Sequence, residues 1–568
     1  MVPYVALASL ALAAFATTLD NGFVWIDHWQ IESGGLIARS WPELAQAVLQ
    51  PLGSMEGWRE AAPYTRPTVI VVLSLVNLLA GISAPAYHAL CVGLHVANTA
   101  LVYSLLGALG AVPVVAWFSA AIFAVHPLQT AAVSWISGIA DPLGAFFLLV
   151  AWRFEVAGRR GGRRLRYYGA AALSFALALG AKETAAVLPL LIAAAYLCVP
   201  TNLRSEKRWS AALRSVWPFL LVLAAVFAYR CLVLSGAALG VQGPAFPLRV
   251  RLQTLSRLLV DYLLLPLRFA ALTTCDDFRV SLTWTAEDTL ATAALGALTL
   301  VVYWLRRHLR QLPFAVVCMT ICLLPALNLV PILHYRADRF FYLPMMGWSL
   351  GVVATVHYVL ARSPRLRRIG VALAVAATVA LLVSTVRRNR LFHDDLTLFE
   401  QVVQVSPHCR EAHTTLGDAY LHAGRSADAA AHYESALVGE SDRASYVVLP
   451  KVLINLGLAR LAQHRYQEAI AALRRAHDIE PQLANPVFGL GVAHMALGES
   501  AEGMRWLEQA DALQANDPDI VLDLARAYDQ AGRSAEAIDR YRQYLGLVIR
   551  GRAREAVAHR VQELSARP

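Results

Sequence analysis

Lysine is almost absent from this chain. Only Lys182, Lys207 and Lys451 occur, although lysine and arginine together number 50 among the 568 residues. Charged residues of all kinds make up 16% of the sequence and hydrophobic residues 57%, a composition too apolar for one soluble protein of this length. Arginine therefore carries nearly all the positive charge, and each remaining lysine becomes a candidate functional residue.

Common chemical motifs are also missing. The seven cysteines form no CxxC pair and no metal-ligand grouping with histidine, so we expect them to be small buried hydrophobic residues. No Walker loop, dinucleotide-binding glycine motif or nucleophilic triad rises above chance. The formal net charge of +10 does not indicate nucleic-acid binding, because the arginines cluster in short loops and form no basic stripe interleaved with aromatic residues.

Hydrophobicity divides the chain into two parts. Residues 1–388 are strings of alanine, valine and leucine broken by short polar stretches, whereas residues 389–568 have the charged composition of a soluble domain. We therefore predict an all-α protein with a polytopic transmembrane domain over 1–388 and a soluble domain over 389–568. We expect about 11–13 spans. The candidate segments lie at 3–19, 67–82, 86–108, 112–125, 128–140, 142–157, 167–181, 184–199, 213–234, 287–305, 312–329, 341–360 and 369–386.

Arginine-rich turns predict the side on which each loop lies, since cytoplasmic loops are enriched in lysine and arginine. These turns lie at 158–166, 204–208, 306–310 and 362–368. The loops at 20–66, 235–286 and 330–340 then fall on the external side, together with the C-terminal domain. By the same alternation we expect His126 at a cytoplasmic turn, and Asp141 and Lys182 at external turns. The apolar but charged stretch 252–272 is predicted to be an interfacial or re-entrant helix.

A helical repeat follows Arg390. Small residues recur at Gly417, Gly457, Gly491 and Ala525, at intervals of 40, 34 and 34 residues, with an insertion over 441–448 in the longer interval. A period of 34 with glycine or alanine at the crossing of two antiparallel helices is the tetratricopeptide signature. We predict about four repeats, which would either bind a protein or peptide in a concave groove or merely cap the membrane domain.

The stretch Gly22–Trp29 places Asp27 and His28 among three aromatic residues, directly after the first apolar segment. An ionisable group at a membrane boundary is a functional candidate by default, because burying its charge is costly. Asp27 is therefore predicted to be a catalytic carboxylate; the alternative is the N-cap of a helix in a hydrated loop.

Two other external turns carry charged candidates. Asp141 begins a membrane helix, where it could cap the helix, orient a substrate as a second acid, or bind a metal. Lys182 and Glu183 could form an ion pair that closes their turn, or Lys182 could capture a phosphate.

Four more candidates precede an aromatic stretch at an external membrane edge, namely His334, Arg336, Asp338 and Arg339. The two arginines could anchor the interface, or grip a lipid phosphate through bidentate hydrogen bonds. Arg66, at the start of the second apolar segment, has the same two possibilities.

Six stretches in order carry a family resemblance: GFVWIDHWQI (22–31), Arg66-Pro67, HPLQTAAVSWISGIADPLGAFF (126–147), AKET (181–184), RADRFFYLP (336–344) and RNRLFHDDLTLFEQVVQVSP (388–407). With these stretches the chain resembles the transmembrane and tetratricopeptide repeat-containing proteins and their bacterial relatives, within the GT-C glycosyltransferases. The resemblance implies transfer of a sugar, such as the hexose mannose, from a polyprenyl-phosphate donor to a protein acceptor. It implies an integral protein of the bacterial inner membrane with the repeats on the periplasmic side.

The resemblance also assigns roles. Asp27 takes the catalytic place, Asp141 the second acidic place, and Lys182, Arg336 and Arg339 are phosphate contacts. Family members often have two adjacent acids where this chain has Ile26-Asp27, so a divalent metal ion is only a possible cofactor. Two alternatives stay open: a non-catalytic membrane-anchored adaptor for envelope protein assembly, and a lipid-sugar transporter, for which internal membrane symmetry is not evident.

Overall fold

The structure is a computed structural model that describes residues 1–47, 66–159, 164–199, 205–233, 246–269, 272–445 and 447–566. Parts of the expected loops at 20–66, 158–166, 204–208 and 235–286 lie outside these residues. Contacts divide the chain into two compact units, Met1–Pro407 with Ser441–Ser445, and His408–Glu440 with Tyr446–Pro568. The first unit therefore includes a helix beyond the expected boundary at 388, and the short segment 441–445.

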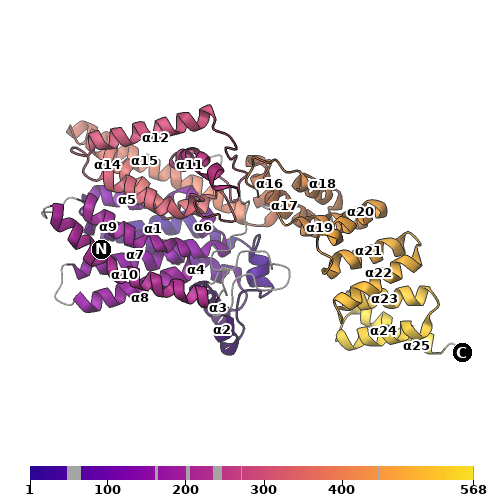
Figure 1. Cartoon of the computed structure of the whole chain (residues 1–568). Coiled ribbons are helices and arrows are strands. Elements are labelled where there is room, and N and C mark those ends of the chain that lie inside the picture. Colours follow the sequence, from indigo (N-terminus) through magenta and orange to yellow (C-terminus); the bar gives the residue numbers. More distant parts are fainter. Residues whose placement is uncertain are drawn as a thin grey trace. The chain divides into compact units, whose positions relative to one another are not determined.

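Helices make up all the regular structure of the described residues, as predicted, apart from an isolated β-bridge between Arg279 and Arg443. The α-helices of the first unit are α1 (Val2–Phe15), α2 (Trp41–Ala47), α3 (Pro67–Ala80), α4 (Ala84–Ala108), α5 (Pro113–Val125), α6 (Thr130–Val133), α7 (Ala140–Gly158), α8 (Arg164–Ala181), α9 (Leu188–Cys198), α10 (Ser205–Val233), α11 (Leu248–Leu264), α12 (Ala286–Leu305), α13 (Leu312–Leu323), α14 (Pro344–Leu360), α15 (Pro364–Asn389) and α16 (Asp395–Val405) (Figure 1).

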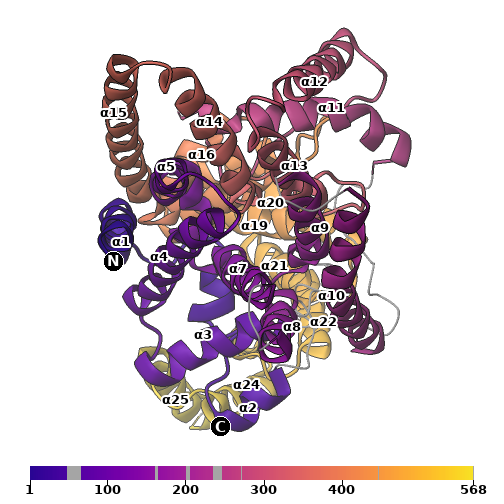
Figure 2. The ribbon, with the colours of Figure 1, turned by 90° about the vertical axis from the view of Figure 1, so that its left-hand side faces the viewer.

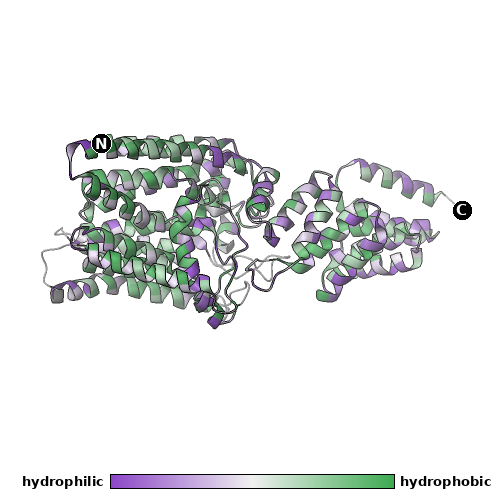
Figure 3. Cartoon of the chain, turned by 90° about the horizontal axis from the view of Figure 1, so that it is seen from above, coloured by the Kyte–Doolittle hydropathy of each residue, from purple (hydrophilic) through white to green (hydrophobic). Residues whose placement is uncertain are grey.

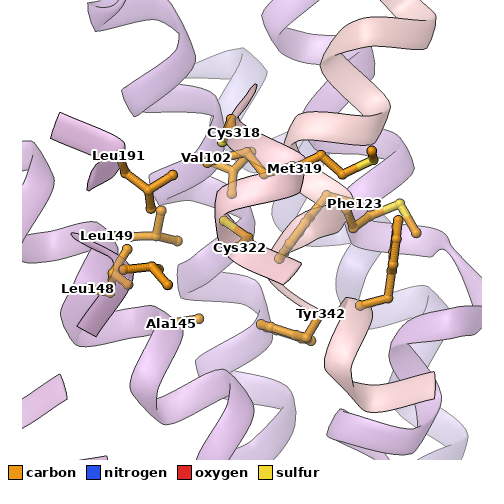
Figure 4. Close-up of a cluster of buried hydrophobic side chains, with 14 of the residues drawn as sticks. Val102, Phe123, Ala145, Leu148, Leu149, Leu191, Cys318, Met319, Cys322 and Tyr342 are labelled. Atoms are coloured by element: carbon orange, nitrogen blue, oxygen red, sulfur yellow. The ribbon is translucent and has the colours of Figure 1, made fainter. Parts of the chain in front are cut away.

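Apolar side chains from several helices form one core in the first unit. Val102 of α4, Phe123 of α5, Leu148 of α7, Leu191 of α9 and Cys322 of α13 belong to the same buried cluster (Figure 4). The helices of this unit are coloured largely hydrophobic along their lengths (Figure 3). All seven cysteines are buried or half-buried, as expected of small packing residues.

Five helical stretches among the described residues are long and apolar enough to cross a membrane: Val2–Asp20, Ala84–Ala108, Lys207–Leu232, Ala286–Leu305 and Pro364–Phe392. Pro113–Val125 and Pro127–Val133, which meet at a bend of 51°, would together make a sixth. Four shorter apolar helices are Pro67–Ala80, Glu183–Cys198, Leu312–Ala326 and Pro344–Leu360. By length and composition alone, this count is smaller than the 11–13 spans expected.

The expected membrane segment at 128–140 is wrong. It consists of three short elements, η3 (Pro127–Gln129), α6 and η4 (Ile136–Ile139), and most of its residues are buried. The His126 ring contacts the Pro266 carbonyl at 3.0 Å, and Thr130 accepts a hydrogen bond from Arg388 at 2.7 Å. Because Arg388 is near the C-terminal end of α15, the segment lies at that end of the bundle. His126 therefore lies at the same end as Asp141, so the prediction that these two residues lie on opposite sides is also wrong.

Helix α3, expected as a span at 67–82, crosses the end of the bundle instead (Figure 2). Ser74 and Asn77, along its length, both hydrogen-bond to the backbone of Ala38 in the first loop. Arg66, just before the helix, contacts Glu183. Polar partners along the whole helix explain why its apolar sequence does not place it through the bundle.

Helix α11 covers most of the stretch predicted to be an interfacial or re-entrant helix. Its buried residues are Val250, Thr254, Leu258 and Tyr262, four positions apart. This spacing puts one stripe of the helix against the protein, and most of the other residues of α11 are half-buried. Its position at a membrane interface stays a prediction.

The second unit is a tetratricopeptide solenoid, as predicted. Its helices are α17 (Arg410–His422), α18 (Ser426–Leu437), α19 (Leu449–Ala462), α20 (Tyr466–Ile479), α21 (Ala484–Ala496), α22 (Ser500–Leu513), α23 (Pro518–Gln530), α24 (Ser534–Leu547) and α25 (Arg552–Ser565). The first eight pack as four antiparallel pairs. A Cβ at Gly457 would come within 2.5 Å of Leu473, which explains why small residues recur where paired helices cross.

Two glycines on α14 can be used to test how closely this helix packs against α13. A Cβ at Gly347 would lie 2.6 Å from the Met319 nitrogen of α13, whereas one at Gly351 would lie 3.4 Å from Ala315. We expect Gly347→Ala to lower the free energy of unfolding by about 1–3 kcal/mol. Gly351→Ala should leave it unchanged or raise it by about 0.5–1 kcal/mol, since alanine favours a helix. Unfolding of both variants in detergent tests this; equal effects would contradict the packing.

Candidate active site

Asp27 is fully buried and its carboxylate is held by neutral donors. Oδ1 accepts hydrogen bonds from the Ser137 backbone nitrogen at 2.8 Å and from the Ser137 hydroxyl, and Oδ2 accepts one from the Val24 nitrogen at 3.3 Å. Asp27 precedes the short π-helical turn η2 (His28–Glu32), but its side chain makes no capping bond with that turn. The alternative interpretation as a helix N-cap is therefore wrong.

Burial raises the pKa of Asp27 to about 6, while the hydrogen bonds from Ser137 and Val24 and the charge of His28 act in the opposite direction. The carboxylate is charged at neutral pH but binds a proton far more readily than an exposed aspartate. A basicity close to the working pH is what general base catalysis requires.

His28 is half-exposed and lies between two acids. Its Nε2 is 3.3 Å from Asp395 and its Nδ1 is 2.6 Å from Glu32. The hydrogen bond with Asp395, followed by that with Glu32, raises the pKa of His28 to about 9 despite partial burial. His28 is therefore an imidazolium at neutral pH. It can support a negative charge on Asp27, but it cannot accept a proton itself.

Trp25 turns the chain immediately before Asp27. Its backbone is in the left-handed region, at φ 58°, which is uncommon for a residue other than glycine. Its ring stacks on Trp135 with 4.6 Å between centroids and meets His334 edge-on at 6.0 Å. The guanidinium of Arg339 lies 5.2 Å from the Trp135 ring, and it contacts the His334 ring at 3.1 Å. His334 and Arg339, two of the predicted residues, thus lie against the Trp25–Trp135 pair beside Asp27.

Lys182 pairs with Asp141 across helices α7 and α8. The Nζ of Lys182 is 2.5 Å from Oδ1 of Asp141, so the predicted pair with Glu183 does not form. Burial lowers the pKa of Lys182; Asp141 opposes this effect, and the charges of Arg66 and Arg339 add to it. The Lys182 ammonium is also 5.5 Å from the Phe340 ring. These cations are therefore close enough to repel one another.

Glu183, which begins η5 (Glu183–Val187), adds one more arginine, Arg230, to this group. Its carboxylate contacts Arg66 at 3.2 Å and Arg230 of α10 at 2.7 Å. Each of the two acids at this place, Asp141 and Glu183, thus contacts at least one cation. The cluster thus has four cations, Arg66, Lys182, Arg230 and Arg339, against the two acids Asp141 and Glu183.

Arg336 belongs to a different network. It is buried, and its guanidinium contacts Asp261 at 2.6 Å, Asp276, and Asp338 at 3.8 Å. Asp338, at the start of η8 (Asp338–Phe341), also contacts Arg388 at 3.1 Å. Burial raises the pKa of Asp338 to about 6 against the influence of both arginines. This network joins Asp261 and Asp276 to Arg388 near the end of α15.

The contacts therefore separate the predicted residues into two sets. One set lies near Asp27, Trp135 or Lys182 and comprises Asp27, His28, Arg66, Asp141, Lys182, Glu183, His334 and Arg339. The other set is Arg336 with Asp338.

A divalent metal does not fit this arrangement. Within the part of the chain that the structure describes, no three His, Cys, Asp or Glu side chains are placed to hold a metal ion. Asp27 is bound to Ser137 and Val24, and Asp141 to Lys182. No step proposed below uses a metal.

Four residues at this site were not predicted. Ser137 and Trp135 lie in the quoted stretch 126–147, and Asp395 lies in the quoted stretch 388–407, but the sequence gives no sign of their partners. Arg230 lies inside an apolar segment. The rule that an ionisable residue in such a segment is a functional candidate could have found it.

Comparison with known proteins identifies the repeats. Tetratricopeptide repeat family models match residues 385–445 and 460–520. Among solved structures, MamA is 21% identical with a TM-score of 0.24, and covers 27% of this chain and 85% of its own. Pseudomonas aeruginosa pilF is 18% identical with a TM-score of 0.26, and covers 32% of this chain and 76% of its own.

One curated protein resembles part of the chain. Protein O-mannosyl-transferase Tmtc1 of Drosophila melanogaster is 30% identical over 189 residues, which are 31% of this chain and 21% of that protein. The match thus spans about a fifth of the length of that relative. The chain contains tetratricopeptide repeats, and part of it is similar to a protein O-mannosyl-transferase.

Proposed function

We propose that this protein is a membrane glycosyltransferase that moves a sugar from a polyprenyl-phosphate donor to a protein acceptor. The observation that carries the proposal is a buried carboxylate, Asp27, near a cluster of cations at one end of an apolar helix bundle. The partial similarity to a protein O-mannosyl-transferase favours a hexose such as mannose. The repeats gather the acceptor, and this end of the bundle faces the periplasm from the bacterial inner membrane.

Asp27 acts as the general base. The acceptor hydroxyl attacks the anomeric carbon of the donor while Asp27 takes its proton. A new carbon–oxygen bond forms to the acceptor as the bond to the phosphate oxygen breaks, and polyprenyl phosphate leaves with the electron pair. Because the displacement is direct, the sugar configuration inverts.

The cations act on the leaving group. Negative charge grows on the phosphate as its bond to the sugar breaks, and preformed positive groups stabilise it most in a site that excludes water. Lys182, Arg339 and Arg66 are the proposed contacts, because the charges of the two arginines reach the Lys182 ammonium. Asp141 holds Lys182 in place.

Asp27→Asn should abolish transfer. Purified protein is incubated with a labelled polyprenyl-phosphate sugar and an envelope protein extract, and label in protein is counted. The exposed Asp20 in the same loop provides the matched control, and Asp20→Asn should transfer at the wild-type rate. Full transfer by Asp27→Asn would remove Asp27 from the catalytic role.

The same variant should be more stable than wild type at neutral pH. The pKa of Asp27 in the folded protein is about 6, above its ordinary value of 3.8. The protonated Asp27 side chain therefore contributes stability at low pH, and this contribution is lost as pH rises through 6. At pH 7.5 we expect Asp27→Asn to gain about 1–3 kcal/mol, and at pH 4.5 much less. Thermal unfolding at both values measures this. A loss of stability of equal size at both would contradict the burial argument.

The rate of sugar transfer should also decrease at acidic pH. Since Asp27 must be ionised to accept a proton, kcat should decrease as pH is lowered through about 6.

Lys182→Gln should reduce kcat about 100-fold or more, the usual cost of removing one group that stabilises charge in a transition state. The exposed Lys207 supplies the control, and Lys207→Gln should keep the wild-type rate. A double variant, Lys182→Gln with Asp141→Asn, avoids leaving a carboxylate without its partner. If the double variant transfers normally, Lys182 does not contact the leaving group.

The second candidate is a non-catalytic, membrane-anchored adaptor. The matching family models favour it, since both describe repeats, and such repeats bind proteins. It requires Asp27→Asn and Lys182→Gln to preserve the cellular function while loss of the repeats removes it. The transferase requires the substitutions alone to remove it.

A further inference from the structure

The loop that carries Asp27 rests on the segment that follows the last long helix of the first unit. Asn21 donates a side-chain hydrogen bond to the Asn389 carbonyl at 3.1 Å, and the Gly22 nitrogen donates to the His393 carbonyl at 3.1 Å. A Cβ on Gly22 would lie 3.2 Å from that carbonyl. The backbones therefore approach closely, although the two segments are far apart in sequence.

Asp395, the first residue of α16, makes the most extensive of these contacts. Its Oδ1 accepts a hydrogen bond from the Trp25 backbone nitrogen at 2.6 Å, and its Oδ2 lies 3.3 Å from Nε2 of His28. One turn further along α16, Phe399 meets the Trp25 ring edge-on at 5.7 Å. One carboxylate thus holds the chain on both sides of Asp27.

Trp25 needs such support because of its backbone conformation. A tryptophan at φ 58° is unfavourable and persists only where the surroundings fix it. The hydrogen bond from its nitrogen to Asp395 and the stacking on Trp135 supply that constraint. The turn made there directs the next residues inward, where Asp27 meets Ser137.

We propose that Asp395 is a positioning residue for Asp27, holding the Trp25–His28 turn so that the buried carboxylate stays aligned for proton transfer. The inference rests on the proposed function for its catalytic meaning. It adds to that function a residue from the junction between α15 and α16.

The neighbouring acid, Asp394, has a different task and makes a matched control. It is the N-cap of α16 and accepts a hydrogen bond from the Thr397 nitrogen at 2.8 Å. It also contacts the side chains of Thr397 and of His393, the latter at 3.2 Å. Asp394→Ala therefore weakens the start of α16, whereas Asp395→Ala removes the contacts with the loop.

The charged groups around the turn give a second readout. His28 faces Asp395, Glu32 and Asp27, and Asp27 also meets Ser137 and Val24. Asp395→Asn keeps an oxygen that can accept from the Trp25 nitrogen but removes the charge beside His28. His28 then loses its proton more easily, so less positive charge supports the ionised form of Asp27. The acid limb of the pH profile should move to higher pH.

The experiment compares wild type with Asp395→Ala, Asp395→Asn and Asp394→Ala, all as the full chain in detergent. Transfer from the labelled donor gives kcat, KM and the pH profile, and amide hydrogen exchange reports on residues 22–29. We expect Asp395→Ala to lower kcat about 100-fold, the scale of a small misplacement of a catalytic group. Its donor KM should stay within about twofold, and exchange in 22–29 should rise. Asp394→Ala should match wild type in all three measurements.

The outcomes separate the two claims. If wild type transfers sugar and Asp395→Ala does so at the same rate, with unchanged exchange, the positioning role is wrong and the proposed function stands. Equal losses in Asp394→Ala and Asp395→Ala would also overturn it, because damage to α16 would explain both. If wild type transfers nothing, the proposed function fails, while raised exchange confined to Asp395→Ala would still support Asp395 holding the turn.

Discussion

The hydrogen bonds between Asp27 and Ser137 are the interaction on which the rest of the candidate site depends. A carboxylate removed from water is costly to ionise unless donors replace its hydration. Ser137 supplies two such donors and Val24 a third. They are enough to keep the carboxylate in place but too few to cancel the effect of burial on its pKa. A buried acid that stays moderately basic is the consequence.

The other acids nearby show why the choice of neutral donors matters. Asp141 contacts Lys182, and Glu183 contacts Arg66 and Arg230, so the charge on each is matched by a cation. Burial would raise the pKa of Glu183, but Arg66 and Arg230 lower it to about 2, so Glu183 is a poor base. The hydrogen bonds of Asp27 come from neutral groups, and its cation, His28, acts through its charge. The proposed division between a base and the contacts to a leaving group rests on these different partners.

The sequence predicted much of this architecture, because periodicity and composition are local properties. The repeat interval at Gly457, Gly491 and Ala525 predicted the solenoid, and the cost of a charge near an apolar segment made Asp27 a candidate. Partners far apart along the chain were not accessible. Arg336 and Arg339 occupy one motif, yet Arg336 meets three acids while Arg339 lies beside Trp135. Their spacing cannot distinguish these environments.

The error at 128–140 concealed the residues that complete the site. An apolar run of this length reads equally as a membrane helix or as a buried irregular segment. As a span it would carry its two ends about 30 Å apart and move His126 to the opposite side. The predicted span at 67–82 is the second error, and it likewise moves every later turn to the opposite side. The two errors cancel beyond residue 140, so the prediction still placed Asp141 and Lys182 on the same side as Asp27. Between the two errors the predicted sides of the turns differ from the structure, and inside 126–139 the short elements bring Ser137 to Asp27 and Trp135 to Trp25. Folding an apolar segment back at the end of the bundle is thus what makes a buried, moderately basic carboxylate possible there.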